Sequence, residues 1–204
     1  KNFIESLNIF RKHGFDNINV DLMFSLPNQT PKMWEETLNN VCRLGVEHIS
    51  CYSLILEEGT PIYQLIKSGQ LSIPDDETDR KMNRMAKEIL DIYGYKQYEI
   101  SNYSKEGFQC VHNLIYWNNE EYIGIGAGSH SKIDRVRYWN YRSIEEYIAR
   151  LKNNELPVED REIISTEEGL WETIMLGLRL NTGLFIPDIN EKYSINFMEK
   201  YGDV

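Results

Sequence analysis

The stretch INVDLMFSLPNQTPKMWEETLNNVCRLG, residues 18–45, decides the fold class of this chain. It opens with a nearly continuous apolar run, INVDLMFSL, which is typical of a buried strand in a parallel sheet. Thr30 then offers a helix N-cap, and Pro31 follows at the first helical position. Apolar residues repeat at helical spacing over residues 34–44 and stop at Gly45. The stretch therefore predicts a strand followed by a helix.

The same alternation continues on both sides of this stretch. A helical pattern over residues 3–10 stops at Gly14, before the strand, and another over residues 82–92 stops at Gly94, before YKQYEIS. HISCYSLIL, residues 48–56, is the next apolar run. Glycine at each stop supplies the left-handed residue that ends a helix. The pattern predicts an α/β fold with a parallel sheet, too short to close a barrel and therefore partial or open.

The second half of the chain has a different character. Residues 98–141 are rich in Tyr, Trp and Gly, and they predict short strands and loops. We place a domain boundary near Pro157, which gives domains at 1–157 and 158–204. The second domain is expected to be helical, and its first helix is expected to end near Gly183. Capping boxes mark two helix starts, at Ser143-x-x-Glu146 and Ser165-x-x-Glu168.

Composition excludes several classes of function. The formal net charge of -10 over 204 residues disfavours nonspecific binding to nucleic acid or to an anionic membrane. No apolar run approaches the ~20 residues of a membrane span. The three cysteines, Cys42, Cys51 and Cys110, are far apart and do not form a disulfide framework. We therefore expect a cytoplasmic protein with no nucleic-acid partner.

Cys110-Val-His112-Asn113-Leu-Ile-Tyr116-Trp117 is the strongest candidate for a ligand site. In a strand or in a helix, His112 shares a side with Tyr116, and Asn113 with Trp117. Neutral imidazole is a good ligand for haem iron, and the neighbouring rings would supply apolar surface to a porphyrin. The alternative is a hydrogen-bonded core histidine with two packing aromatics, and the residues alone leave both interpretations open.

Other polar positions are weaker candidates. The segment Gly124-Ile-Gly126-Ala-Gly128-Ser-His130 fails the dinucleotide-binding spacing, and it is typical of a strand that another backbone or a ligand approaches closely. Asp21 interrupts an apolar run. Since an unpaired buried carboxylate is costly, we expect Asp21 either to face a pocket near a strand end or to meet a buried partner.

Several motifs occur together in an order that identifies a family. They are DLMFSLPNQT, HISCYSLILEEGTPIY, YEISNYS, GIGAGSHS and LWETIMLGLRL. With them the chain resembles, over almost its whole length, the oxygen-independent coproporphyrinogen III oxidase family of radical SAM proteins. HNLIYW, from His112 to Trp117, is similar to the HNxxYW signature of the HemW branch, the haem chaperones. The resemblance implies the C-terminal part of a partial (β/α) radical SAM barrel, followed by a shortened helical domain.

The resemblance also implies site residues. His112 would bind haem iron, Asn113 would orient the site, and Tyr116 and Trp117 would pack on the porphyrin, with Cys110 beside them. A second set matches positions on the S-adenosylmethionine side of the barrel in the family: Asp21, Tyr52, Ile55 and His130.

The implied role is haem binding and its delivery to a client protein, a respiratory enzyme. The alternative within the family is oxidative decarboxylation of coproporphyrinogen III with S-adenosylmethionine. An open barrel edge would also expose strand backbone, so the third interpretation is a scaffold that forms a homodimer.

The iron–sulfur motif of the family lies outside this sequence. CxxxCxxC and the glycine-rich S-adenosylmethionine segment belong before Lys1, and Cys42, Cys51 and Cys110 do not reproduce the spacing. Because a cluster needs several thiolates together, we expect S-adenosylmethionine and a 4Fe-4S cluster only in a full-length protein. This chain is expected to carry no catalytic residue and no radical chemistry.

Overall fold

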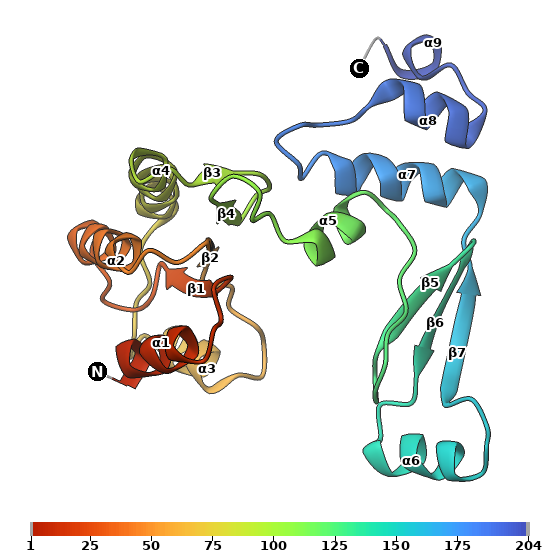
Figure 1. Ribbon diagram of the computed structural model, residues 1–204, viewed down its shortest axis with the longest axis horizontal. Helices are drawn as coiled ribbons and strands as arrows, with labels where there is room; N and C mark the ends of the chain where they lie inside the picture. Colours follow the sequence, from red (N-terminus) through yellow and green to blue (C-terminus); the bar gives the residue numbers. More distant parts are fainter. Residues whose placement is uncertain (1, 203–204) are drawn as a thin grey trace. The chain divides into compact units, whose positions relative to one another are not determined.

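A computed structural model describes residues 2–202 and divides the chain into two compact units, one up to Gln109 and one from Cys110 onward (Figure 1). The domain boundary expected near Pro157 lies inside the second unit. There β7 (Val158–Ile163) pairs with β6 (Val136–Asn140), so the chain on both sides of Pro157 belongs to one sheet. Pro157 therefore lies in a connection between two elements of the same unit.

The first unit is a four-stranded sheet in the order β1-β2-β4-β3, with helices packed on it. Strands β1 and β2 are parallel, as the sequence predicts, whereas β4 pairs antiparallel with both β2 and β3. The connection between β3 and β4 is short, and a short connection joins antiparallel strands only. The elements in order are α1 (Asn2–Lys12), β1 (Asn19–Phe24), α2 (Pro31–Arg43), β2 (His48–Ser53), α3 (Pro61–Lys67), α4 (Asp76–Ile92), β3 (Lys96–Gln97) and β4 (Asn102–Ser104).

The core of this unit lies between the sheet and helices α2 and α4. Trp34 of α2 is fully buried, and its indole Nε1 donates to the Met82 carbonyl oxygen of α4 at 2.9 Å. Its ring lies 5.4 Å from the ring of Phe24. Thr30 caps α2, as expected, by accepting from the Met33 amide. The predicted helical stripe therefore provides the buried face of the unit.

The second unit combines an antiparallel three-stranded sheet, in the order β5-β6-β7, with helices. Residues 111–117 form a helix within the region expected to hold strands and loops. The Ser165–Glu168 capping box begins α7, but α7 ends at Gly177 rather than near Gly183. The remaining elements are α5 (Val111–Trp117), β5 (His130–Ile133), α6 (Ile144–Lys152), α7 (Thr166–Gly177), α8 (Ile186–Tyr193) and α9 (Phe197–Tyr201).

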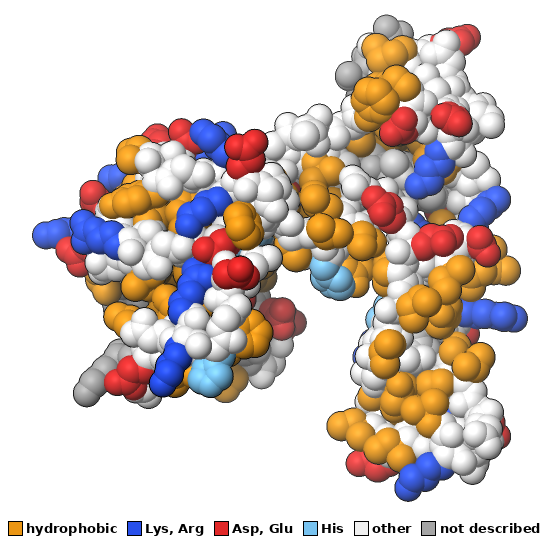
Figure 2. All heavy atoms as spheres, viewed as in Figure 1, with side chains coloured by type: hydrophobic (Ala, Val, Ile, Leu, Met, Phe, Trp, Pro, Cys, Tyr) orange, Lys and Arg blue, Asp and Glu red, His pale blue; other side chains and the backbone are white. Residues whose placement is uncertain are grey.

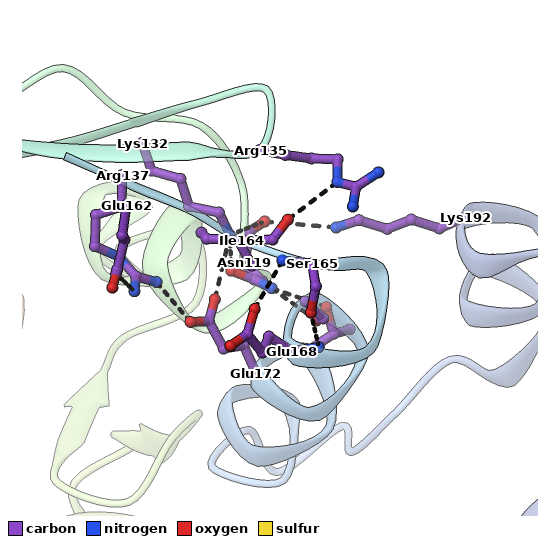
Figure 3. A network of polar contacts seen from close by, with 12 residues as sticks. Asn119, Lys132, Arg135, Arg137, Glu162, Ile164, Ser165, Glu168, Glu172 and Lys192 are labelled. Atoms are coloured by element: carbon purple, nitrogen blue, oxygen red, sulfur yellow. Dashed lines mark hydrogen bonds and ion pairs between the residues drawn. The ribbon is translucent and has the colours of Figure 1, made fainter.

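A polar network joins α7 to this sheet (Figure 3). The Glu172 carboxylate of α7 accepts from Arg137 Nη2 at 2.7 Å and lies 3.8 Å from Lys132 Nζ. Lys132 is buried and also donates to the side chain of Asn119, just after α5. Burial lowers the pKa of Lys132, whereas the charge of Glu172 acts to raise it. The network therefore holds α7 and the end of α5 against one face of the sheet.

Candidate functional site

Helix α5 places His112 and Tyr116 on one side, one helical turn apart. Cys110 is the N-cap residue, and the helix runs from Val111 to Trp117. The His112 and Tyr116 rings lie 4.8 Å apart between centroids and meet edge to face at 82°. His112 is exposed. Of the two interpretations left open by the sequence, the structure excludes a buried core histidine.

Trp117 lies on a different side of α5. It lies five positions after His112, which turns its side chain by about 140° around the helix axis relative to that of His112. The Arg179 guanidinium lies 4.4 Å from the centroid of the Trp117 ring. The indole Nε1 is buried with no hydrogen-bond partner, and Trp117 lines a cavity of about 480 Å³ together with residues of α7 and α8. The structure therefore groups His112 with Tyr116 and places Trp117 apart from them.

The residues expected on the S-adenosylmethionine side belong to both units. Asp21 and Tyr52 share one face of the first sheet, because Asp21 pairs with Ser50 and Tyr52 follows two residues later. Asp21 is exposed, and its Oδ1 accepts from Asn19 Nδ2 at 2.8 Å. Ile55 is 80% exposed in the loop after β2. Asp21 therefore is not a buried carboxylate. Water and the exposed Asn19 side chain interact with it, and the expected buried partner is not needed.

His130 begins β5 in the second unit, so it does not share the sheet of Asp21 and Tyr52. It is exposed, and its ring stacks on Trp139 of β6 at 5.7 Å and 29°. The backbone opposite it explains the glycine-rich segment. A Cβ on Gly124 would overlap the carbonyl oxygen of His130. The predicted close approach of another backbone is confirmed at Gly124, whereas the predicted strand is not formed: residues 124–129 lie outside the strands, and β5 begins only at His130.

His48 is a buried polar residue, next to Asn19 on the face that carries Asp21, that sequence reasoning missed. Its Nδ1 lies 2.6 Å from Asn19 Oδ1, and its Nε2 lies 2.8 Å from the Tyr98 hydroxyl. Burial lowers the pKa of His48, while the charge of Asp21 acts to raise it. Donation from Nδ1 to Asn19 and from the Tyr98 hydroxyl to Nε2 satisfies a neutral ring. The alternation of His48, Ser50 and Tyr52 along β2 was the available signal for this polar face.

The cysteines do not fit an iron–sulfur cluster. Burial raises the pKa of the Cys42 thiol to about 11 and also raises the pKa of Cys51, so both thiols are protonated at neutral pH. Cys110 belongs to the other unit. Over residues 2–202, no group of three or more His, Cys, Asp or Glu side chains is arranged to hold a metal ion.

No family model matches the chain, but several curated proteins are similar to it over most of its length. The heme chaperone HemW of Bacillus subtilis (strain 168) is 39% identical over 193 residues, covering 95% of this chain and 51% of that protein. HemW of Lactococcus lactis is 34% identical over 202 residues, covering 98% and 52%. The mitochondrial radical S-adenosyl methionine domain-containing protein 1 of Danio rerio is 30% identical, covering 92% and 46%.

A solved structure shares the fold. It is coproporphyrinogen III oxidase (HemN) from Escherichia coli, described as a radical SAM enzyme, with a TM-score of 0.76 and 16% sequence identity over 98% of this chain and 49% of that one. The chain thus has the fold of this radical SAM enzyme. By its identity to the curated relatives, the chain belongs to the HemW family. It spans about half the length of the curated relatives it matches.

Proposed function

We propose that this chain binds haem and that the His112 imidazole is an iron ligand. The observation that carries the proposal is an exposed histidine at the start of α5, with the Tyr116 ring 4.8 Å away. Haem iron commonly takes a histidine ligand, and an aromatic ring offers apolar surface to the macrocycle. The relatives named heme chaperones support haem binding over the alternative, decarboxylation of coproporphyrinogen III.

Magnitudes explain why the iron bond matters. Burial of on the order of 400 Å² of apolar porphyrin surface, at about 25 cal/mol per Å², contributes about 10 kcal/mol gross to the binding free energy. Association itself costs about 4–15 kcal/mol in lost freedom. Because these quantities nearly cancel, binding becomes tight only with an axial bond and the groups that orient it. His112 supplies the bond, and Asn113 and Tyr116 are proposed to orient it.

The other predicted site residues lie outside the His112–Tyr116 pair. Cys110 at the N-cap of α5 and Trp117 at its last residue are proposed to contact haem only at the ends of the helix. Asp21, Tyr52 and Ile55 are proposed to border S-adenosylmethionine in a protein that also contains the cluster segment. An exposed carboxylate fixed by Asn19 suits the hydroxyl or ammonium donors of such a ligand.

The direct test is titration of the purified chain with ferric haem, followed by the Soret absorption band. The wild-type chain should shift the band to that of a histidine-ligated haem, and His112→Ala should lose that spectrum and bind at least about tenfold more weakly. His13→Ala is a matched control, because His13 is also exposed but lies in α1's unit. An unchanged spectrum in His112→Ala would exclude His112 as the ligand.

Delivery to a client extends the proposal. A haem-accepting respiratory enzyme, a homodimer and a cytoplasmic location stay predictions. No helix within residues 2–202 is both long enough and apolar enough to cross a membrane. Transfer of haem from the loaded chain to apomyoglobin, an unrelated acceptor, would measure whether the bound haem can be released. Sedimentation over a range of concentrations would reveal or exclude the homodimer.

A further inference from the structure

We infer that the haem-contacting surface extends from α5 onto the sheet of the second unit, through Tyr122, His130 and Trp139. This inference rests on the proposed haem binding and deepens it. It assigns His130 to the haem site, whereas the resemblance to the family implied a position on the S-adenosylmethionine side. We call the face of the β5-β6-β7 sheet that carries His130 and Trp139, with Tyr122 bridged to its edge, the aromatic face.

Strand register places these side chains on one face. His130 pairs with Trp139 across β5 and β6, and their rings stack at 5.7 Å. Tyr122 forms an antiparallel bridge with Lys132, and Lys132 lies two residues beyond His130. Because directly opposed and alternate residues of a sheet share a face, Tyr122 is the diagonal neighbour of His130.

Ring contacts connect this face to α5. The Tyr122 ring lies 4.6 Å from the Tyr116 ring, which in turn lies 4.8 Å from the His112 ring. Ring contacts therefore lead from the proposed iron ligand to Tyr122, and strand register places the His130–Trp139 stack diagonally next to Tyr122 on the same face. All of them belong to the second unit, so the series does not depend on the placement of the first unit.

The two ends of the aromatic face differ. At one end Lys132 and Arg137 bind Glu172 of α7 (Figure 3), and this end is covered. At the other end His130 is exposed and Trp139 is half-buried. The covered end holds α5 and α7 in place, and the open end leaves ring surface and an imidazole accessible to a ligand.

The opposite face of the same sheet is chemically different. It lines an open cavity of about 630 Å³ with mainly aliphatic side chains from the sheet and α6. Figure 2 shows hydrophobic side chains gathered over α6 and the adjoining end of the sheet. Among residues 2–202, no histidine lines that cavity. A flat aromatic ligand with an iron centre matches the face with rings and imidazoles better than the aliphatic one.

The test is ferric haem titration of the full chain carrying His130→Ala, Trp139→Ala or both. The double variant should bind haem about tenfold more weakly, a change of about 1.4 kcal/mol. His13→Ala and Trp171→Ala are matched controls, since both side chains are exposed and lie outside the series. Both controls should bind as the wild type does. Trp139→Phe keeps a ring and should retain most of the affinity.

The outcomes separate this inference from the proposed function. If His112→Ala loses haem but the double variant binds within twofold of the wild type, the aromatic face is not part of the site. If His112→Ala binds normally, the proposed ligand is wrong, whatever the double variant does. Circular dichroism identifies misfolded variants. Should the double variant misfold, the exposed single substitution His130→Ala decides, and unchanged affinity and an unchanged Soret band would overturn the inference.

Discussion

At the scale of single residues, the histidines of this chain differ by environment. His48 is buried, with both ring nitrogens engaged by Asn19 and Tyr98. His112 and His130 are exposed and face aromatic rings. Burial favours the neutral imidazole, so His48 has a structural role within the first sheet, whereas the exposed rings are available to a ligand.

His48 gives a prediction about pH. Its pKa is lowered in the folded chain, chiefly by burial, so the unfolded chain binds the proton at higher pH than the folded one does. Stability from this group is therefore present above the unfolded pKa of about 6.5 and is lost as pH falls below it. Urea unfolding at pH 7.5 and 5.5 should show a smaller pH effect in His48→Gln than in the wild type.

The control for this prediction is His13→Gln, which changes an exposed histidine just after α1. It should keep the pH dependence of the wild type. Equal pH dependence in the wild type and in His48→Gln would show that the buried ring does not titrate in this range. Trp34 is the tryptophan of the first unit, and its fluorescence reports on unfolding there.

At the scale of elements, helix ends were readable from the sequence and strand partners were not. Thr30, Ser143 and Ser165 each cap a helix where the local sequence predicts one. These signals act over a few residues. The antiparallel pairing of β2 with β4 joins segments about fifty positions apart, and no local pattern encodes that partner.

Gly124 provides a test of the close approach of its backbone to the start of β5. Gly124→Ala would place a methyl group against the carbonyl backbone of His130, and backbone gives way less readily than a side chain. We expect a loss of about 1–3 kcal/mol in the free energy of unfolding, as for overpacking, measured by urea unfolding. Gly169→Ala is the control, because its Cβ would meet only ordinary contacts with Tyr193 and Ile164. Equal stability of Gly124→Ala and the wild type would contradict this close approach.

At the scale of the whole molecule, the two units differ in how they are stabilised. The buried hydrophobic cluster lies entirely in the first unit, around Trp34 and Leu38. The second unit has few fully buried apolar side chains and relies on capped helices and the Lys132–Glu172–Arg137 network. A unit with little apolar burial opens at lower free-energy cost.

The unit boundary predicts a pattern of limited proteolysis. Residues 106–109 are exposed, and Phe108 among them is a chymotrypsin site. Because cleavage favours exposed segments between compact units, the earliest cut should follow Phe108 and give two fragments identifiable by mass spectrometry. Phe108→Ser should delay that cut. A first cut within residues 141–165 would instead support the boundary near Pro157.

The sequence by itself determined the βα alternation, the helix caps, the family and the motif containing His112, because each rests on short-range spacing or on an ordered set of motifs. Only the tertiary structure decided the antiparallel additions to the first sheet, the unit boundary at Gln109 and the buried environment of His48. It also decided that Tyr122 contacts Tyr116 of α5 and shares a sheet face with His130 and Trp139. Those relations depend on strand register between segments distant in the chain, and register arises from burial and pairing in three dimensions.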